Sequence, residues 1–456
     1  MKTNYREALA LRIIDTWLDY KSRYSGLPGY QVCIRNKGQV IFNKAYGHAN
    51  LKTKRKLKTD DLFRIASQSK TFTSAAVLQL VQDGRLTLQQ TVVDHLPQLR
   101  KHKDERFKKI TVRDLLSNRS GIFRDGLEST FWELHKPFLN KEQLLQEVLS
   151  ADLIYDPNTC TKYSNIGYAL LGIVLENAMG MPYSKAMDTL VLQKLEGTHI
   201  YSDYAEDIKQ VFADGHTRPF FEGKRLPLKH ASANAISPAT GFCASAEDTS
   251  LFFDTFLLGK GLTNKDLQQE LLSMNWPVTN SSNERYGYGL GFNKISDIEL
   301  MGHSGGYPGF STQTLHPVGT DSIISFFMNT NEYIPGQALI SIIKVLNKIN
   351  DTFTENEAKE ANVSEPLMNK WGGRIFVVSK TKGLSFPLDF WSFDSLYFSS
   401  RNGENYTCEK QNGIDNIGEI LTFTKDKQGK ILSAHWGASS FPLEDVFFEN
   451  IKKTLM

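Results

Sequence analysis

Hydrophobic and polar positions first alternate and then recur at helical spacing, which predicts strands followed by helices. Residues 29–35 and 40–46 alternate like strands on either side of Asn36-Lys37-Gly38, and this pattern predicts a hairpin. Apolar positions then predict helices over 112–118, 141–150, 166–179 and 246–258. Strand patterns return at 288–293 and 322–328, ahead of a helical pattern over 338–346. We therefore expect an α/β core in which strands from both ends of this region close one sheet.

The pattern changes again after residue 349. Residues 350–365 are polar and acidic and precede Pro366, which is typical of a linker. Short alternating segments further on predict antiparallel strands, at 374–378, 384–399, 419–423 and 430–436. We expect three parts: a first domain over 1–349, a linker over 350–365, and a small β-barrel or sandwich over 366–456.

One predicted helix begins with residues that suggest chemistry, Ser67-Gln68-Ser69-Lys70. The extended pattern of 62–66 precedes it, and Gly84 is a suitable end. Ser67 would then lie at a helix N-terminus, where free N–H groups and the helix dipole favour developing negative charge. Residues three apart share a helix face, so Lys70 would lie beside the Ser67 hydroxyl. Because a desolvated lysine with a lowered pKa can activate a serine, the segment predicts serine acyl transfer.

The same spacing of serine and lysine occurs twice more, so context has to select among three matches. Ser341-Ile342-Ile343-Lys344 lies inside the amphipathic helix pattern of 338–346. Ser379-Lys380-Thr381-Lys382 lies where two strands are expected to turn. Both positions favour a structural interpretation, and the match at Ser67 remains the candidate.

Two further motifs could supply the proton donor and the oxyanion hole that such a reaction needs. Tyr163-Ser164-Asn165 precedes the helix pattern of 166–179, and an extended conformation would place Tyr163 and Asn165 on the same side. His303-Ser304-Gly305-Gly306 follows a strand pattern at 298–301. Its glycines would let the backbone approach a bound acyl group closely.

In this order, the three motifs resemble those of the serine β-lactamase and penicillin-binding protein family, on its class C, DD-peptidase and esterase side. Further similar stretches lie at 110–122, 244–248 and 286–292, and the resemblance covers roughly residues 25 to 345. It implies a β-lactamase/transpeptidase-like α/β (α+β) fold, with a central antiparallel sheet flanked by helices and an all-helical region. The C-terminal part weakly resembles the lipocalin-like extension of some D-peptidases.

The resemblance also implies catalytic roles. Ser67 would be the acylated nucleophile, and Lys70 the base or proton relay. Tyr163 would protonate the leaving group, and it could also share the role of base. The backbone N–H groups of Ser67 and Gly306 would form the oxyanion hole.

Substrate binding would involve Asn165, which would hold the substrate amide or Lys70, and the third motif with His303, Ser304, Gly305 and Gly306. Many β-lactamases have lysine at the first position of this motif. Histidine is only partly charged near neutrality, so His303 should bind a β-lactam carboxylate weakly. We expect hydrolysis of a small amide or ester, with a D-amino-acid-containing peptide as the best fit. The alternatives are a carboxylesterase, a weak β-lactamase, and a catalytically weak scaffold or assembly protein.

A different hydrolase class competes for one of these motifs. Residues 302–306 also read G-x-S-x-G, the nucleophile elbow of α/β-hydrolases, with Asp394 and His435 downstream in the order that fold requires. An elbow must lead directly into a helix. The segment Tyr307-Pro308-Gly309 would break one, so this interpretation is the weaker of the two.

Composition excludes other classes. The chain has 456 residues, of which 40% are hydrophobic, and its net charge of +3 is too small to indicate nucleic acid as the main partner. The four cysteines form no CxxC pair and the histidines have no metal-ligand spacing, so we expect no metal and no cofactor. The expected partner is a small-molecule or short-peptide substrate, and a homo-oligomer is compatible with the sequence.

The distribution of apolar residues predicts neither a membrane span nor a signal peptide. No run of about 18 apolar residues occurs, so no membrane span is expected. The first 20 residues lack the continuous apolar stretch of a signal peptide. The sequence as given therefore predicts a cytoplasmic protein, or a periplasmic or secreted one if a leader has been removed.

Overall fold

The chain forms two compact units, Pro28–Pro335 and a second that combines Met1–Leu27 with Gly336–Met456. The computed structural model describes residues 4–455, except 128, 260, 280, 282, 296, 333, 393–394, 401, 411–416 and 438. These units differ from the domains expected from the sequence, because helices α1 (Tyr5–Tyr24) and α11 (Pro335–Thr352) group with the C-terminal sheet. The expected linker contains the end of α11, helix α12 (Glu355–Glu360) and strand β14 (Asn362–Val363).

The unit Pro28–Pro335 contains the predicted central antiparallel sheet. Its strand order is β3-β2-β1-β13-β12-β11-β10-β9-β8. The strands are β1 (Gly29–Asn36), β2 (Gln39–Asn50), β3 (Arg55–Lys56), β8 (Trp276–Pro277), β9 (Glu284–Gly287), β10 (Leu290–Ile295), β11 (Ile298–Tyr307), β12 (Phe310–Pro317) and β13 (Ser322–Met328). Because β1 pairs with both β2 and β13, segments from the two ends of this region meet in one sheet, which confirms the expectation.

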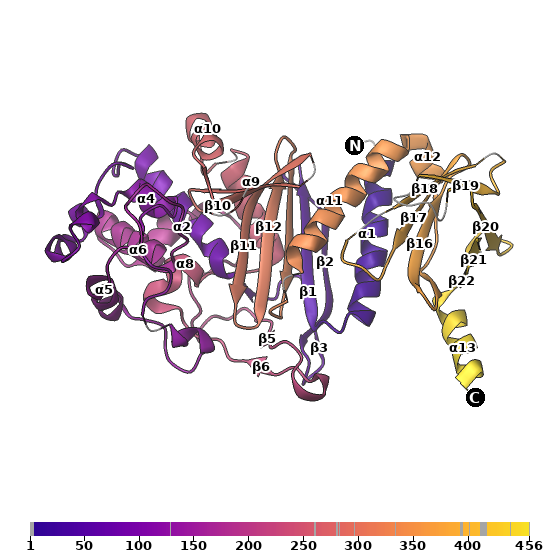
Figure 1. Ribbon diagram of the computed structural model, residues 1–456, viewed down its shortest axis with the longest axis horizontal. Helices are drawn as coiled ribbons and strands as arrows, with labels where there is room; N and C mark the ends of the chain where they lie inside the picture. Colours follow the sequence, from indigo (N-terminus) through magenta and orange to yellow (C-terminus); the bar gives the residue numbers. More distant parts are fainter. Residues whose placement is uncertain are drawn as a thin grey trace. The chain divides into compact units, whose positions relative to one another are not determined.

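Helices and short strands occupy the long stretch between these two groups of strands. The helices are α2 (Ser69–Gln82), α3 (Val92–His95), α4 (Val112–Leu116), α5 (Lys141–Ser150), α6 (Asn165–Met179), α7 (Tyr183–Leu190), α8 (Ser237–Thr240), α9 (Ala246–Leu257) and α10 (Lys265–Ser273). The short strands pair as β4 (Phe63–Arg64) with β7 (Cys243–Ala244), and as β5 (Gly215–His216) with β6 (Pro227–Leu228). Figure 1 shows α2, α4, α5, α6 and α8 grouped beside β11 and β12.

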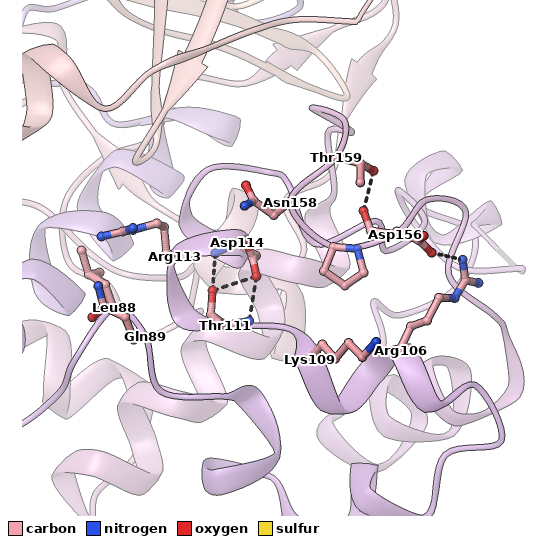
Figure 2. Close-up of a pocket in the computed structure, with 11 residues that line it drawn as sticks. Leu88, Gln89, Arg106, Lys109, Thr111, Arg113, Asp114, Asp156, Asn158 and Thr159 are labelled. Carbon is pink, nitrogen blue, oxygen red and sulfur yellow. Dashed lines mark hydrogen bonds and ion pairs between the residues drawn. The ribbon is translucent and has the colours of Figure 1, made fainter.

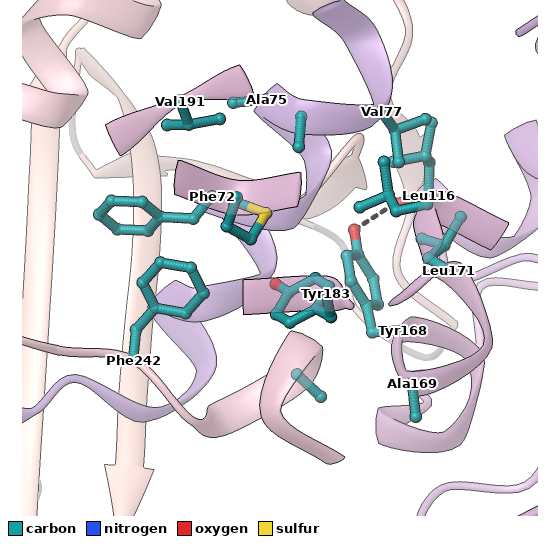
Figure 3. Close-up of a cluster of buried hydrophobic side chains, with 14 of the residues drawn as sticks. Phe72, Ala75, Val77, Leu116, Tyr168, Ala169, Leu171, Tyr183, Val191 and Phe242 are labelled. Atoms are coloured by element: carbon teal, nitrogen blue, oxygen red, sulfur yellow. Dashed lines mark hydrogen bonds between the residues drawn. The ribbon is translucent and has the colours of Figure 1, made fainter. Parts of the chain in front are cut away.

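Helix α2 is the centre of the helical region. All of its residues from Ser69 to Leu80 are buried, which is typical of a helix enclosed on every side. Figure 3 shows Phe72 of α2 beside Phe242, with ring centroids 4.6 Å apart. In the same cluster, the Tyr168 hydroxyl of α6 donates to the carbonyl of Leu116, 2.6 Å away. The start of α2, with Ser67 just before it, is therefore held in a fully packed environment.

The second unit contains a sheet that differs from the expected barrel. Its order is β14-β16-β17-β18-β19-β20-β21-β22, with β15 paired to β16. The strands after β14 are β15 (Leu367–Asn369), β16 (Gly372–Val378), β17 (Lys382–Pro387), β18 (Leu396–Ser400), β19 (Tyr406–Lys410), β20 (Ile420–Lys425), β21 (Ile431–Trp436) and β22 (Ser439–Pro442), and helix α13 (Glu444–Leu455) follows. The predicted barrel is not closed in the described residues: β14 and β22 are the two ends of the strand order, and an isolated bridge joins Leu367 of β15 to Leu443 after β22.

Two helices of this unit contact one loop after β17. The indole of Trp17 in α1 donates to the Phe390 carbonyl at 3.3 Å, and the Tyr20 hydroxyl donates to Asp389 at 2.8 Å. Ser341 in α11 donates to the Trp391 carbonyl at 2.7 Å. These bonds tie both helices to the C-terminal sheet. No helix among the described residues is long and apolar enough to cross a membrane.

Candidate active site

Ser67 lies in a short 3-10 turn, Ala66–Gln68, that leads from β4 into α2. Ala66 has a φ of 53°, a left-handed conformation that is strained for a residue with a Cβ. Neighbouring bonds hold it there: the Ser69 hydroxyl donates to the Ala66 carbonyl at 2.5 Å, and the Ile65 N–H donates to Phe242 at 3.0 Å. Ser67 thus lies at the start of the helix, as predicted, on a turn that is fixed at both ends.

Lys70 is completely buried one helical turn from Ser67. Its ammonium lies 3.3 Å from the Ser67 hydroxyl, 2.7 Å from the Asn165 side-chain oxygen and 2.8 Å from the Ala239 carbonyl. Burial, the largest cause, lowers the pKa of Lys70 well below its usual value, although Asp125 opposes this shift. The neutral amine, which can accept a proton, is therefore favoured far more than in an exposed lysine.

Tyr163 contacts both residues of this pair. The Lys70 ammonium lies 4.6 Å from the centroid of the Tyr163 ring. Burial raises the pKa of Tyr163 above its usual value, and a hydrogen bond with the Ser67 side chain partly offsets that shift. Tyr163 consequently keeps its proton at neutral pH and can donate it. The expectation that Tyr163 and Asn165 point to the same side is correct, since both contact Lys70.

Asn165 is held by a residue that the sequence did not single out. Its side-chain nitrogen donates to Asp125 at 2.5 Å, while its oxygen accepts from Lys70. Asp125 also accepts from the Trp132 indole at 3.1 Å and from Arg124 at 2.9 Å. Because the carboxylate only accepts hydrogen bonds, Asp125 fixes the orientation of the Asn165 amide.

The third motif lies on β11, directly beside the turn that carries Ser67. β10 pairs with β11 from Ile298 to Gly302, and no described strand pairs with 303–307 on that side, which leaves this edge open. Gly305 allows the close approach, since a Cβ there would be 2.1 Å from the Ile65 carbonyl oxygen. Ser304 and Gly306 are exposed, and a Cβ on Gly306 would meet no atom within 4 Å. The open edge next to Ser67 can receive an extended substrate.

His303 is a neutral hydrogen-bonding residue in this site. Its Nδ1 lies 2.6 Å from the Ser304 carbonyl, which can only accept, so Nδ1 carries the hydrogen. Its Nε2 therefore accepts from the Tyr286 hydroxyl at 3.1 Å. Burial and then the Lys70 charge lower the pKa of His303 to about 3. The sequence predicted a partly charged histidine, and the packing around it removes that charge at neutral pH.

Three supporting residues were missed, each for a different reason. Asp125 lies in an irregular loop with no periodic pattern. Ala239 contributes only its carbonyl, which no side-chain motif reports. Tyr286 lies in the stretch 286–292 that resembles the family, and this position was the available signal.

The elbow interpretation of residues 302–306 does not fit the structure. Ser304 lies within β11, opposite Gln313 of β12, and no helix follows it. Asp394 lies outside the described residues, and His435 lies on β21 of the second unit. The other two serine and lysine pairs also belong to that unit, in α11 and after β16.

A separate pocket lies on the helical region. Figure 2 shows it with Thr111, Asp114 and Asp156 among its lining residues, and its volume is about 540 Å³. Arg106 at its rim is paired with Asp156 at 2.8 Å. None of the predicted site residues lines this pocket.

The fold, together with half-buried Ser67 and Tyr163 around the fully buried Lys70, is compatible with a serine hydrolase. The model of the beta-lactamase family matches residues 14–341, so the chain belongs to this family. It is 28% identical over 346 residues to a penicillin-binding protein of Bacillus subtilis, over 73% of each chain. The protein flp of Staphylococcus aureus is 26% identical over 71% of this chain and 64% of its own length.

Solved structures support the same fold. An octameric penicillin-binding protein homologue from Pyrococcus abyssi is similar over 95% of this chain and 99% of its own, with a TM-score of 0.64 and 19% identity. A D-amino acid amidase from Ochrobactrum anthropi is similar over 75% of this chain and 99% of its own, with a TM-score of 0.62 and 20% identity. The β-lactamase/transpeptidase-like fold expected from the sequence is therefore confirmed.

Proposed function

We propose that the protein hydrolyses a small amide through an acyl-enzyme on Ser67, and that the acyl group comes from a D-amino acid or a D-amino-acid-containing peptide. The observation that carries this proposal is the fully buried Lys70 ammonium, 3.3 Å from the Ser67 hydroxyl. Burial favours the neutral amine, which can take the Ser67 proton as the oxygen attacks the carbonyl carbon. The lowered pKa of Lys70 and the raised pKa of Tyr163 favour Lys70 as the base.

The remaining groups have complementary roles in the same step. The tetrahedral oxyanion is stabilised by the N–H groups of Ser67 and Gly306, at the start of α2 and on the open edge of β11. Tyr163 gives its proton to the leaving nitrogen as the carbon–nitrogen bond breaks, and Lys70 returns a proton to Tyr163. Water then attacks the ester on Ser67 and releases the acid. Asn165 holds Lys70 in position through its side-chain oxygen.

The third motif supports an open-chain amide substrate rather than a β-lactam. A neutral His303 gives no fixed positive charge for a β-lactam carboxylate, so efficient β-lactamase action is not expected. One structurally similar protein is a D-amino acid amidase, and its similarity to this chain extends across the whole of that enzyme. A carboxylesterase uses the same acyl-enzyme, and the substrate panel below separates the two activities.

A fluorophosphonate probe tests the nucleophile. We expect covalent labelling of the native protein and none of Ser67→Ala. Ser304→Ala serves as the control, because it removes the serine of the competing motif. Labelling that persists in Ser67→Ala and disappears in Ser304→Ala would refute the proposal.

A substrate panel tests the acyl group. It contains matched D- and L-alanine p-nitroanilides, p-nitrophenyl acetate and nitrocefin. We expect the D-anilide to have the highest kcat/KM relative to its uncatalysed rate. A preference for the acetate ester would favour the esterase, whereas no turnover and no Ser67 label would favour the scaffold.

A further inference from the structure

Arg124 is a basic residue at the candidate site whose side chain has no assigned role. Its backbone is fixed, because the Arg124 carbonyl accepts from the N–H groups of Asn165 at 2.9 Å and Ile166 at 3.2 Å. The side chain is 63% exposed, and its Nε donates to Asp125 at 2.9 Å. Its two terminal nitrogens have no hydrogen-bond partner among the residues that the structure describes. A rigid backbone thus presents an open guanidinium edge to solvent.

This guanidinium lies over the proposed proton donor. Its central carbon is 5.3 Å from the centroid of the Tyr163 ring. Lys162 adds a second positive charge nearby, with its ammonium 3.4 Å from the Tyr163 carbonyl. After burial, which is the largest cause in each case, the Arg124 charge also lowers the pKa of Lys70 and of Lys162. Arg124 therefore lies on the side of the site that holds Tyr163.

The place of the Arg124 guanidinium beside Tyr163, and its chemistry, limit what it can bind. The atom that receives the Tyr163 proton is the leaving nitrogen, so groups next to the Tyr163 ring face the leaving portion of the substrate. The two terminal nitrogens of Arg124 can each donate one N–H in the same plane, which matches the two oxygens of a carboxylate. His303 is neutral and cannot supply a competing positive charge on β11. Asp125 occupies only the Nε side of Arg124, which leaves the other edge available.

We infer that Arg124, supported by Lys162, binds a carboxylate on the leaving group, so that the enzyme prefers substrates that release a free amino acid or another carboxylate-bearing product. This inference rests on the proposed function and adds the class of leaving group. It differs from a role of Arg124 in folding, which would affect all substrates equally.

Two thioesters with the same acyl group measure the preference directly. One is N-acetyl-D-alanyl thioglycolate, whose leaving thiol carries a carboxylate, and the other is the corresponding thioglycolamide. The released thiol is followed with a disulfide reagent. Because a hydrogen-bonded charge pair contributes about tenfold or more, we expect the full chain to favour the carboxylate by at least that ratio in kcat/KM.

Variants assign the preference to Arg124. We expect the ratio to fall to near one in Arg124→Gln, with the change mainly in KM, and to stay partly raised in Arg124→Lys, which keeps the charge without the planar fork. Arg100→Gln is the matched control, since Arg100 is similarly exposed, is likewise paired with an aspartate, Asp94, and has no contact with Ser67, Lys70 or Tyr163 in the part of the chain that the structure describes. It should leave the ratio unchanged.

The outcomes separate the inference from the proposed function. The inference would be overturned if the ratio of kcat/KM for the two thioesters is the same in the native chain and in Arg124→Gln. A loss of activity that is equal for both thioesters gives this result too. Fluorophosphonate labelling of Ser67 is measured in the same samples. Absence of both labelling and turnover in the native chain would remove the proposed function, and the inference with it.

Discussion

A histidine held neutral by its surroundings makes the stability of a protein depend on pH. The pKa of His303 is about 3 in the folded chain, because burial and the Lys70 charge oppose its protonation. In the unfolded chain the ordinary value is about 6.5. Between these values the unfolded state binds more protons, so the free energy of unfolding should fall as the pH falls from about 6.5 towards 3.

Replacing His303 by glutamine should therefore reduce acid sensitivity. At pH 4.5 the histidine accounts for about 2 to 3 kcal/mol of lost stability relative to pH 7. We expect the free energy of unfolding in urea to fall by that much less in His303→Gln than in the native chain. The comparison between two pH values cancels any loss of packing. His135→Gln, at an exposed position, should behave like the native chain, and equal acid sensitivity in His303→Gln would contradict the prediction.

Asp125 should affect both the geometry and the pH dependence of the reaction. Its carboxylate fixes the Asn165 amide at 2.5 Å and raises the pKa of Lys70 against the larger effect of burial. Asp125→Asn removes the charge and lets Asn165 rotate. We expect kcat/KM to fall about tenfold or more, because a hydrogen bond to a charged group is lost. The acid limb of its pH profile should also move to lower pH.

Asp156→Asn is the control for this change, since Asp156 is paired with Arg106 on the separate pocket. It should alter neither the rate nor the acid limb. A loss of rate in Asp125→Asn without movement of the acid limb would assign Asp125 a structural role alone.

Among the elements, the contact between β11 and the Ser67 turn determines the shape of the site. At Gly305 a methyl group would lie 2.1 Å from the Ile65 carbonyl oxygen and 2.6 Å from the Thr312 hydroxyl. Gly305→Ala should push the strand away from the turn, lower the free energy of unfolding by about 2 kcal/mol and abolish labelling of Ser67.

Gly306→Ala is the matched comparison on the same strand. Its methyl group would meet no atom within 4 Å, so the free energy of unfolding should change by less than about 0.5 kcal/mol. Equal destabilisation by the two substitutions, measured by urea unfolding, would show that the close approach at Gly305 does not hold the strand in place.

Sequence patterns predicted most of these elements because local spacing reports burial. The hairpin at Lys37 and Gly38, the helix after Ser67 and the strand carrying His303 all follow from periodicity or turn chemistry. The strained Ala66, the Ala239 carbonyl and the neutral state of His303 depend on neighbours that are distant in sequence. The open C-terminal sheet was not predicted, because alternating apolar and polar residues indicate strands but do not indicate whether the first strand pairs with the last.

At the scale of the whole molecule, the first and last segments of the chain fold together. Helices α1 and α11 belong to the same compact unit as the C-terminal sheet, and both bond to the loop at 388–391. A division at residue 365 would separate these helices from their partners. The family match, residues 14–341, includes residues 14–24 of α1, a helix that groups with the C-terminal sheet.

A fragment of residues 1–365 tests this arrangement. It keeps α1 and α11 but lacks Asp389, Phe390 and Trp391, so it exposes apolar surface and unpaired polar groups on both helices. We expect aggregation, or a Tm at least about 5 °C below that of the full chain by scanning calorimetry. A fragment of residues 1–443, which lacks only α13, keeps the loop and the sheet and should lose much less. If the 1–365 fragment is as stable and as soluble as the full chain, the helices do not depend on the C-terminal sheet, and the boundaries at 349 and 366 are the better division.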